Sequence, residues 1–312
     1  MQVFDGHCDT LLRCYRQGGG FRENSGHLDL KRMGKLGKCA QFFAVFGSPD
    51  ETPGCSLWEV FLAQEAIFRR EMAANSGLVT HCRTAGEAEA AWAAGKQAAF
   101  LSVEGAELLE CDLQKLEEAY HMGVRAVNLT WNHENHLSGS NNESSQKGLT
   151  EQGKSFVRRM QELGMLVDVS HLSDPGFWDV MELARKPVFA SHSNSRAICP
   201  HKRNLTDEQF TAIIGNHGVA GLNMAAEFVG QSEPTIDTVV AHIEHWLSLG
   251  GGKNISLGGD WDGIKDMPRG IAGFQDLEAV AERLLRMNYP EQQVKDLFYN
   301  NLMRVVREVC TM

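Results

Sequence analysis

Six side chains of the types that bind metal ions follow short apolar runs of the sequence, where strands are expected to end. They are His7, Asp9, Glu104, His171, His192 and Asp260. Residues two apart on an extended backbone point to the same side, so His7 and Asp9 can reach one cation. Taken singly, each has a plainer explanation, such as a helix N-cap for Asp9 or an Asp/Gly turn for Asp260. The recurrence of the pattern along the chain is what favours a shared metal site.

The number and type of these donors indicate two metal ions rather than one. Three imidazoles and three carboxylates exceed the four ligands that one zinc ion takes, whereas two divalent cations with one shared carboxylate fit the set. Two such cations and a hydroxide would balance the three negative charges, which makes the site easier to bury. The absence of thiol ligands argues against a structural zinc site, since Cys8 lies between two predicted ligands and should point to the opposite face.

The elements that would position these donors alternate between strands and helices. Apolar runs predict strands at residues 3–5, 40–46, 98–103, 126–129, 165–169, 187–190, 219–223 and 255–257. Stretches with a 3.6-residue period predict helices at 57–74, 113–121, 155–163, 176–184, 207–216, 235–249, 275–287 and 291–309. Alternating strands and helices imply parallel pairing, so we expect an amidohydrolase-like (β/α)8 TIM-type barrel, with its site at the C-terminal ends of the strands. A doubly wound open sheet is the alternative, but no Gly-x-Gly-x-x-Gly follows the first strand.

Length, charge and cysteine usage exclude several classes of protein. The chain has 312 residues without a repeat or a Pro/Ser-rich linker, so one domain spanning residues 1–312 is expected. A formal net charge of −10 disfavours nucleic acid and anionic membrane surfaces as partners, and no apolar stretch is long enough to span a bilayer. The N-terminus lacks the features of a signal peptide and the eight cysteines are spaced singly, which predicts free, mostly buried thiols and a cytoplasmic location.

Taken together, these motifs resemble the membrane (renal) dipeptidase family of metallopeptidases. The resemblance covers residues 3 to 263 in family order and continues through Asn300-Asn301-Leu302. It is carried by Asp5-Gly6-His7-Cys8-Asp9-Thr10, Ser102-Val103-Glu104-Gly105, Gly123-Val124-Arg125 with Leu129-Thr130, Val167-Asp168-Val169-Ser170-His171, Pro187-Val188-Phe189-Ala190-Ser191-His192-Ser193, Arg203-Asn204 and Gly258-Gly259-Asp260-Trp261-Asp262-Gly263.

The resemblance implies zinc-dependent hydrolysis of dipeptides, often with tolerance of a D-residue at the C-terminal position. In the family pattern, His7, Asp9 and Asp260 hold one zinc ion, and His171 and His192 hold the other. Glu104 bridges the two, and Arg203 engages the C-terminal carboxylate of the substrate. We expect a bridging hydroxide to attack the peptide bond while Asp260 orients it and carries the proton to the leaving amine. A homodimer is implied at the family level only.

One departure from the family pattern concerns the substrate. Trp131 stands where the mammalian-type members have a substrate-contacting histidine, so the resemblance leaves the specificity open. We expect His133, or alternatively His136, to stabilise the oxyanion in its place. The polar loop from Trp131 to Thr150 is predicted to form a lid over the metals, although a plain surface connection is the alternative. Arg203 also has a simpler interpretation, as a solvated residue of the basic run His201-Lys202-Arg203.

Two other functions are compatible with parts of the pattern. A metal-dependent amidohydrolase could act on a cyclic amide or a nucleobase, but such barrels usually begin with His-x-His and often place a lysine between the metals. A metal-loaded barrel could instead bind a ligand without turnover. The complete ligand set together with Arg203 favours the dipeptidase over this non-catalytic alternative.

Overall fold

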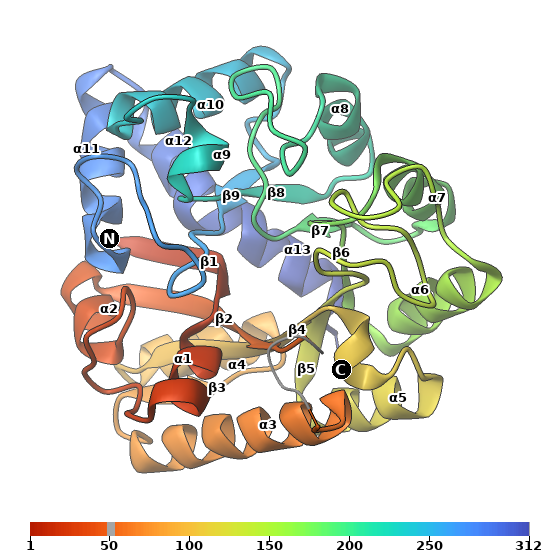
Figure 1. Ribbon diagram of the computed structural model, residues 1–312. Coiled ribbons are helices and arrows are strands. Elements are labelled where there is room, and N and C mark those ends of the chain that lie inside the picture. The colour runs from red at the N-terminus through yellow and green to blue at the C-terminus, as the bar shows by residue number, and fades with distance from the viewer. Residues whose placement is uncertain (49–53, 312) are drawn as a thin grey trace.

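Eight parallel strands close into a barrel in the computed structural model, which describes residues 1–48 and 54–311 (Figure 1). The barrel strands are β1 (Gln2–Cys8), β2 (Lys38–Phe46), β4 (Gln97–Glu104), β5 (Val124–Asn128), β6 (Leu166–Asp168), β7 (Phe189–Ala190), β8 (Val219–Leu222) and β9 (Ile255–Leu257). The barrel closes because β1 pairs with both β2 and β9, while β2 pairs with β4. The predicted (β/α)8 barrel is confirmed, and the open sheet is wrong.

A ninth strand, β3 (Val79–His81), lies outside the closed barrel and was not predicted. It pairs with Gln97–Ala99 of β4, below the part of β4 that pairs with β5. Only Val79 of its three residues is apolar, so the segment shows no apolar run that could indicate a strand. The strand extends the sheet at the end of the barrel opposite to the predicted ligands.

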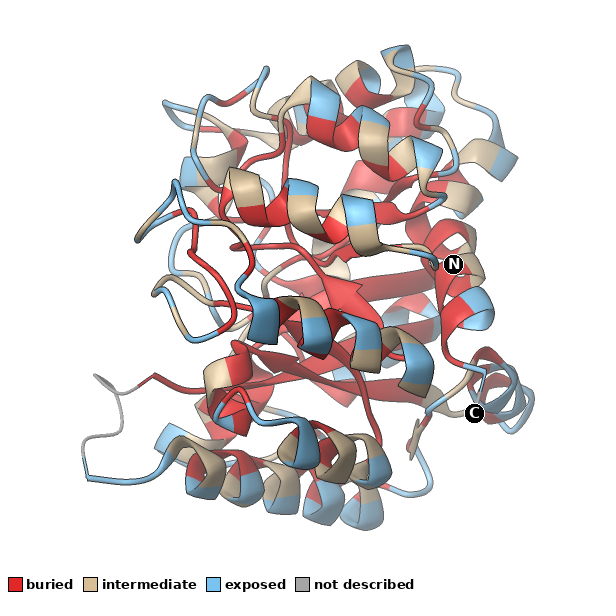
Figure 2. Cartoon of the chain, turned by 90° about the vertical axis from the view of Figure 1, so that its right-hand side faces the viewer, coloured by how far each residue is buried: buried red, intermediate tan, exposed pale blue. Residues whose placement is uncertain are grey.

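The helices between the strands surround the barrel, and their outer faces are exposed while the strands are buried (Figure 2). The helices that match the prediction within a few residues at each end are α3 (Leu57–Ala74), α5 (Leu113–Met122), α6 (Glu151–Leu163), α7 (Asp174–Leu183), α8 (Asp207–Gly215), α10 (Ile236–Ser248) and α11 (Leu277–Arg286). Reciprocal capping boxes begin α3, with Ser56 and Glu59, and α8, with Thr206 and Gln209.

Four short helices escaped the sequence prediction. They are α1 (Thr10–Gln17), α2 (Leu30–Leu36), α4 (Ala85–Ala93) and α9 (Ala226–Val229), and the one-turn segment η1 (Ala106–Leu109) was missed as well. A second such turn, η2 (Phe274–Asp276), overlaps the start of the helix predicted at 275–287. Most of these are too short for two full turns of an apolar stripe. In α4 the run is dominated by alanine, so its buried face has little contrast with its exposed face.

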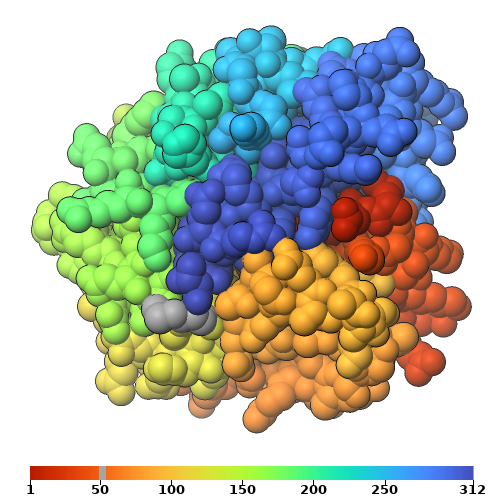
Figure 3. All heavy atoms as spheres, turned by 180° about the vertical axis from the view of Figure 1, so that it is seen from behind, coloured from red at the N-terminus to blue at the C-terminus, as the bar shows by residue number. Residues whose placement is uncertain are grey.

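The predicted continuous helix over residues 291–309 is wrong. The chain forms α12 (Glu291–Lys295), a π-helical turn η3 (Asp296–Asn300) and α13 (Asn301–Val309). The π turn buries Leu297, Phe298 and Tyr299 in succession, which a regular α-helix cannot do against one surface. α13 then lies across the back of the molecule, where it covers the N-terminal end of the barrel (Figure 3).

Aromatic rings fill the barrel interior below the predicted ligands. Phe4, Phe42, Phe100 and Phe189 come from four different strands, and the rings of Phe42 and Phe189 lie 5.6 Å apart although β2 and β7 are not neighbours. The contact therefore crosses the interior. Because side chains alternate along a strand, Phe100 shares its face of β4 with Glu104, four residues further on. The aromatic layer thus forms the floor on which the site is built.

We expect Phe100→Ala to lower the free energy of unfolding by about 3–5 kcal/mol, because it removes a fully buried ring and leaves a cavity. Urea unfolding followed by circular dichroism measures the change. Leu62→Ala is the matched control, since Leu62 is an exposed apolar residue of α3 and its loss should cost well under about 1 kcal/mol. Equal effects of the two substitutions would contradict this account of the core.

Candidate metal centre

The six predicted ligands converge at the C-terminal end of the barrel, with the carboxylate of Glu104 at the centre. Its Oε2 lies 3.3 Å from Nε2 of His7. Its Oε1 lies 3.0 Å from Nε2 of His171 and 3.5 Å from Nε2 of His192. The two oxygens of one carboxylate therefore face different imidazoles, as a ligand shared between two cations would.

Two overlapping groups of donors could each hold a cation. In one, Nε2 of His7 lies 3.4 Å from Oδ2 of Asp9 and 3.9 Å from Oδ1 of Asp260. In the other, His7 combines with Glu104 and His192. The Nε2 atoms of His171 and His192 face each other across 2.9 Å, a contact that needs a proton or a cation between the two lone pairs.

Burial leaves two of these donor atoms without partners. His7, Asp9, Glu104, His171 and His192 are all buried. Within the described residues, 1–48 and 54–311, neither Nε2 of His7 nor Oδ1 of Asp9 forms a hydrogen bond. Buried polar atoms without partners are costly, so a cation that both atoms can ligate fits this pocket.

The electrostatics of the cluster also fit cations. Burial and the neighbouring Glu104 carboxylate raise the pKa of Asp9 to about 7, and burial likewise raises the pKa of Asp260. Burial alone would also raise the pKa of Glu104, but His7 and the other imidazoles hold it well below its ordinary value. Cations in the pocket would keep all three carboxylates ionised at neutral pH, since positive charge favours the ionised form.

Two buried carboxylates outside the predicted set tie the strand ends together. Asp5 accepts hydrogen bonds from the backbone N–H of His7 (3.1 Å) and of Gly259 (2.8 Å). Asp168 accepts from the backbone N–H groups of Ser170 and Ser191, both at 3.0 Å. Burial raises the pKa of each carboxyl to about 6. Each of the two stands three or fewer residues before a predicted histidine ligand, and that spacing is the signal that could have revealed them.

Strained and closely packed backbone positions bring the ligands to the rim. His171 and Asp260 have φ values of 69° and 60°, in the left-handed region that non-glycine residues rarely adopt. A Cβ atom at Gly258 would lie 1.7 Å from the backbone oxygen of Ser191, so glycine is required where β9 passes the residue before His192. Gly258, two residues before Asp260, therefore allows a close approach between two ligand-bearing segments.

Hydrogen bonds at Nδ1 orient both histidines that follow serine. Oδ1 of Asn132 lies 3.1 Å from Nδ1 of His171, and Oγ of Ser191 lies 2.6 Å from Nδ1 of His192. These contacts leave Nε2 of each ring directed at Glu104. Asn132 was not predicted, because nothing in the sequence indicates which loop residue packs against His171.

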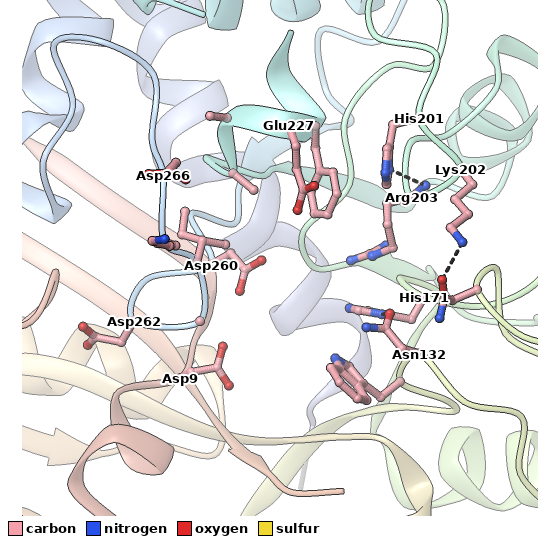
Figure 4. Close-up of a pocket in the computed structure, with 18 of the residues that line it drawn as sticks. Asp9, Asn132, His171, His201, Lys202, Arg203, Glu227, Asp260, Asp262 and Asp266 are labelled. Atoms are coloured by element: carbon pink, nitrogen blue, oxygen red, sulfur yellow. Dashed lines mark hydrogen bonds between the residues drawn. The ribbon is translucent and has the colours of Figure 1, made fainter. Parts of the chain in front are cut away.

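The cluster forms the floor of a cavity of about 850 Å³, and Arg203 stands in its wall (Figure 4). The guanidinium is buried. Its Nη2 donates to the backbone oxygen of His192 at 3.3 Å, whereas Nε and Nη1 have no partner within the described part of the chain. Unsatisfied cationic donors at a cavity suit an anionic ligand. The solvated alternative for Arg203 is wrong, because the side chain is buried.

Comparisons with known proteins assign the family. The family model described as membrane dipeptidase (Peptidase family M19) matches residues 1–312. The chain belongs to this family. An uncharacterized protein in the pqqA 5′ region of Klebsiella pneumoniae is 30% identical over 264 residues, which cover 81% of this chain and 96% of that protein.

Two solved structures share the fold and part of the sequence. One is a metallo peptidase from Rhodobacter sphaeroides liganded with a phosphinate mimic of the dipeptide L-Ala-D-Ala. It has a TM-score of 0.88 and 29% identity, with 99% of each chain covered. The other is a dipeptidase AC, with a TM-score of 0.90 and 29% identity, covering 100% of this chain and 99% of that chain. The chain is a metal-dependent hydrolase of the peptide bond in dipeptides.

The loop that follows β5 contributes to the substrate side of this dipeptidase. Trp131 lines the cavity and packs edge-on against Phe46, with ring centroids 4.8 Å apart. Asn132, Asn141 and Asn142 also line it, so the loop covers part of the site. No helix within residues 1–48 and 54–311 of this family member is long and apolar enough to cross a bilayer.

The expectation for His133 and His136 requires correction. The His133 ring is 45% exposed, and its Nδ1 lies 3.2 Å from Oε2 of Glu143. It is not among the residues that line the cavity over the ligands. His136 is exposed and faces a separate cavity beside Glu107. The loop leaves the cavity wall after Asn132 and returns to it at Asn141, so neither ring lines the site in this dipeptidase.

We expect Gly258→Ala to lower the metal affinity of this dipeptidase by about tenfold or more, because the added methyl group must displace Ser191 and with it His192. Equilibrium competition with a chromophoric chelator measures the affinity. Gly215→Ala is the matched control, since a Cβ there meets nothing within 4 Å. An unchanged metal affinity in Gly258→Ala would show that the close approach does not position the ligands.

Proposed function

We propose that the chain hydrolyses L-Xaa-L/D-Xaa dipeptides with a free C-terminal carboxylate at a centre of two zinc ions. The observation that carries the proposal is the convergence of six buried or nearly buried donors around Glu104 and His7, in a cavity walled by Arg203. The alternatives of a cyclic-amide hydrolase and of a non-catalytic barrel lack comparable support, because the family match is to dipeptidases.

The donors divide into two sites that share one carboxylate. His7, Asp9 and Asp260 form one site, His171 and His192 form the other, and Glu104 belongs to both. The division is supported by the two Glu104 oxygens, of which Oε2 faces His7 and Oε1 faces His171 and His192. When bound, the two cations would lower the pKa of a water molecule and polarise the scissile carbonyl.

Asp260 has the geometry of the proton carrier. Its side chain is 13% exposed and lines the cavity, and its Oδ2 accepts a hydrogen bond from Nδ2 of Asn223 at 2.9 Å. In the proposed reaction this carboxylate accepts a proton from the attacking water and delivers it to the amine that leaves. The hydrogen bond to Asn223 holds the carboxylate in place during both transfers.

Arg203 would select for substrates that end in a free carboxylate. Its Nε and Nη1 are buried donors without hydrogen-bond partners in the described part of the chain, and a carboxylate can accept from Nη2 together with either of them. The backbone oxygen of His192 orients the third nitrogen, which couples the position of the guanidinium to a metal ligand. This arrangement places the substrate terminus at a fixed distance from the cluster, so short peptides are favoured.

The identity of the substrate is supported by the Rhodobacter sphaeroides metallo peptidase, which is liganded with a mimic of L-Ala-D-Ala. That protein is 29% identical to this chain over nearly its whole length. We extend to this chain the tolerance of a D-residue at the C-terminal position. A homodimer and a cytoplasmic location remain part of the proposal, and the eight free cysteines, seven of them buried, are compatible with a reducing compartment.

Chelation tests the metal requirement, and Glu104→Gln tests the shared ligand. We expect the purified chain to contain two zinc ions, to cleave L-Ala-D-Ala, and to lose activity on chelation until zinc is restored. Glu104→Gln should lose bound metal and turnover together, because an amide cannot supply the negative charge that two cations share. Metal content is measured by mass spectrometry, and turnover by release of alanine.

Glu107→Gln is the control for the loss of a carboxylate near this rim. Glu107 faces a different cavity, where its Oε2 accepts from Nδ2 of Asn135 at 2.8 Å, so the substitution should leave two metals bound. Wild-type metal content and rate in Glu104→Gln would refute the bridging role.

We expect Arg203→Met to lower kcat/KM for dipeptides by about 10- to 100-fold, because a charge-assisted hydrogen bond contributes about 1.5–3 kcal/mol. The loss should appear mainly in KM. The matched control is the C-terminal amide of the same dipeptide, which lacks the carboxylate and should be cleaved equally by both proteins. If the variant lost as much activity on the dipeptide amide as on the free dipeptide, Arg203 would not bind the C-terminal carboxylate.

A further inference from the structure

The side chain of Asn132 lies between a proposed metal ligand and the open cavity. Its Oδ1 is 3.1 Å from Nδ1 of His171, and the residue lines the cavity. Figure 4 shows Asn132 beside His171, below Arg203 and across the cavity from Asp9 and Asp260. Its Nδ2 has no hydrogen-bond partner in the part of the chain that the structure describes, residues 1–48 and 54–311. The contact with His171 thus uses the acceptor of the carboxamide and leaves its donors available.

The amide oxygen of Asn132 determines which ring nitrogen of His171 carries the proton. A carbonyl oxygen can only accept, so Nδ1 of His171 must be the N–H and Nε2 must carry the lone pair. That lone pair points at Glu104, 3.0 Å away, and at His192, 2.9 Å away. The opposite amide orientation would donate to Nδ1 and move the proton to Nε2, where it would block a cation. Asn132 therefore has a positioning role.

The backbone of Asn132 is anchored to the same segment as His171. The backbone oxygen of Asn132 accepts from Oγ of Ser140 at 2.7 Å, and Ser140 forms a bridge with Leu172. The N–H of Asn141 donates to the backbone oxygen of His171 at 2.9 Å. These contacts fix the carboxamide relative to His171. A donor that is held in place before the reaction stabilises developing charge without reorganisation.

Most other polar side chains at this wall have other partners, and Asn141, which also lines the cavity, contacts His171 through its backbone N–H and not through its side-chain amide. The Trp131 ring packs against Phe46, and His133 faces Glu143 outside the cavity. Lys202 donates to Oδ1 of Asn142 at the rim. Arg203 carries the positive charge that a substrate carboxylate requires. Asn132 is consequently the neutral donor that touches a proposed ligand and faces the cavity.

We infer that Asn132 acts twice in the proposed dipeptide hydrolysis. Its Oδ1 positions His171, and its Nδ2 donates a hydrogen bond to the oxyanion that forms when water adds to the scissile carbonyl. In that step the water oxygen bonds to the carbonyl carbon and the C=O electron pair moves onto the oxygen. When the pair returns, the C–N bond breaks and the amine takes the proton that the water lost. The inference rests on the proposed function and adds a catalytic residue to it.

Two substitutions separate the roles. Asn132→Asp keeps an oxygen acceptor for His171 but removes the N–H, whereas Asn132→Ala removes both. At saturating zinc, kcat for L-Ala-D-Ala should fall about 100-fold or more in both variants, the usual effect of losing one oxyanion donor. KM should stay within about threefold, because the donor acts only in the transition state. Zinc affinity should fall in Asn132→Ala and be retained in Asn132→Asp.

A phosphinate mimic of L-Ala-D-Ala provides a second readout. Because its tetrahedral centre resembles the oxyanion, its affinity should fall in proportion to kcat/KM in both variants. His133→Ala is the control from the same loop and should keep the wild-type kcat.

The inference is overturned if kcat of both Asn132 variants stays within about threefold of wild type, which is too small a change for an oxyanion donor. It is also overturned if His133→Ala lowers kcat and the Asn132 variants do not. An inactive zinc-loaded wild-type chain would refute the proposed function. The zinc affinities of the two variants would then still decide whether Asn132 positions His171.

Discussion

A buried carboxylate among three imidazoles is the constraint on which this structure depends. Glu104 sits at the centre of the barrel rim, and every proposed ligand is arranged around it or around the neighbouring His7. Burial opposes its negative charge, yet the imidazoles hold its pKa well below the ordinary value. Such a cluster is favourable only when positive charge is concentrated within a few ångströms, because a low-dielectric interior amplifies both attraction and desolvation. The two proposed divalent cations would meet that requirement, which accounts for the polar residues at the strand ends above the aromatic layer.

The rest of the barrel supplies rigidity to this cluster. Asp5 and Asp168 connect backbone segments of neighbouring strands immediately below the ligands, and the layer of phenylalanine rings fixes the strands beneath them. His171 and Asp260 adopt left-handed backbone conformations that the surrounding hydrogen bonds maintain. The part of the cavity wall that faces the substrate has less regular secondary structure. It is built by the loop after β5 and by the segment that carries Arg203, so one barrel can keep its reaction while these loops change the substrate.

Much of the fold could be predicted because the barrel strands are buried on both faces and therefore appear as apolar runs. The misses follow from the same principle. β3 has one apolar residue in three, and α4 is rich in alanine and has no distinct apolar stripe. The π turn at Asp296–Asn300 shifts the phase of an apolar periodicity that looks continuous in the sequence. The site could be predicted wherever a donor follows a strand directly. The site could not be predicted where the conformation of a loop decides which side chain faces the cavity. For this reason His133 was expected at the cavity and Asn132 was not.

The sequence by itself determined the class of chemistry. Few functions other than metal binding call for strands that end in His-x-Asp, Glu, Ser-His and Gly-Gly-Asp, and the alternation of strands and helices brings these strand ends to one rim. It also determined the family, since the motifs recur in order along the chain. Only the tertiary structure decided which oxygens of Glu104 face which imidazoles, that Arg203 is buried with free donors, and which nitrogen of His171 faces the ligands. Those properties depend on distances between segments that lie far apart in the sequence or on loop conformation, and neither is encoded in any local pattern of residue types.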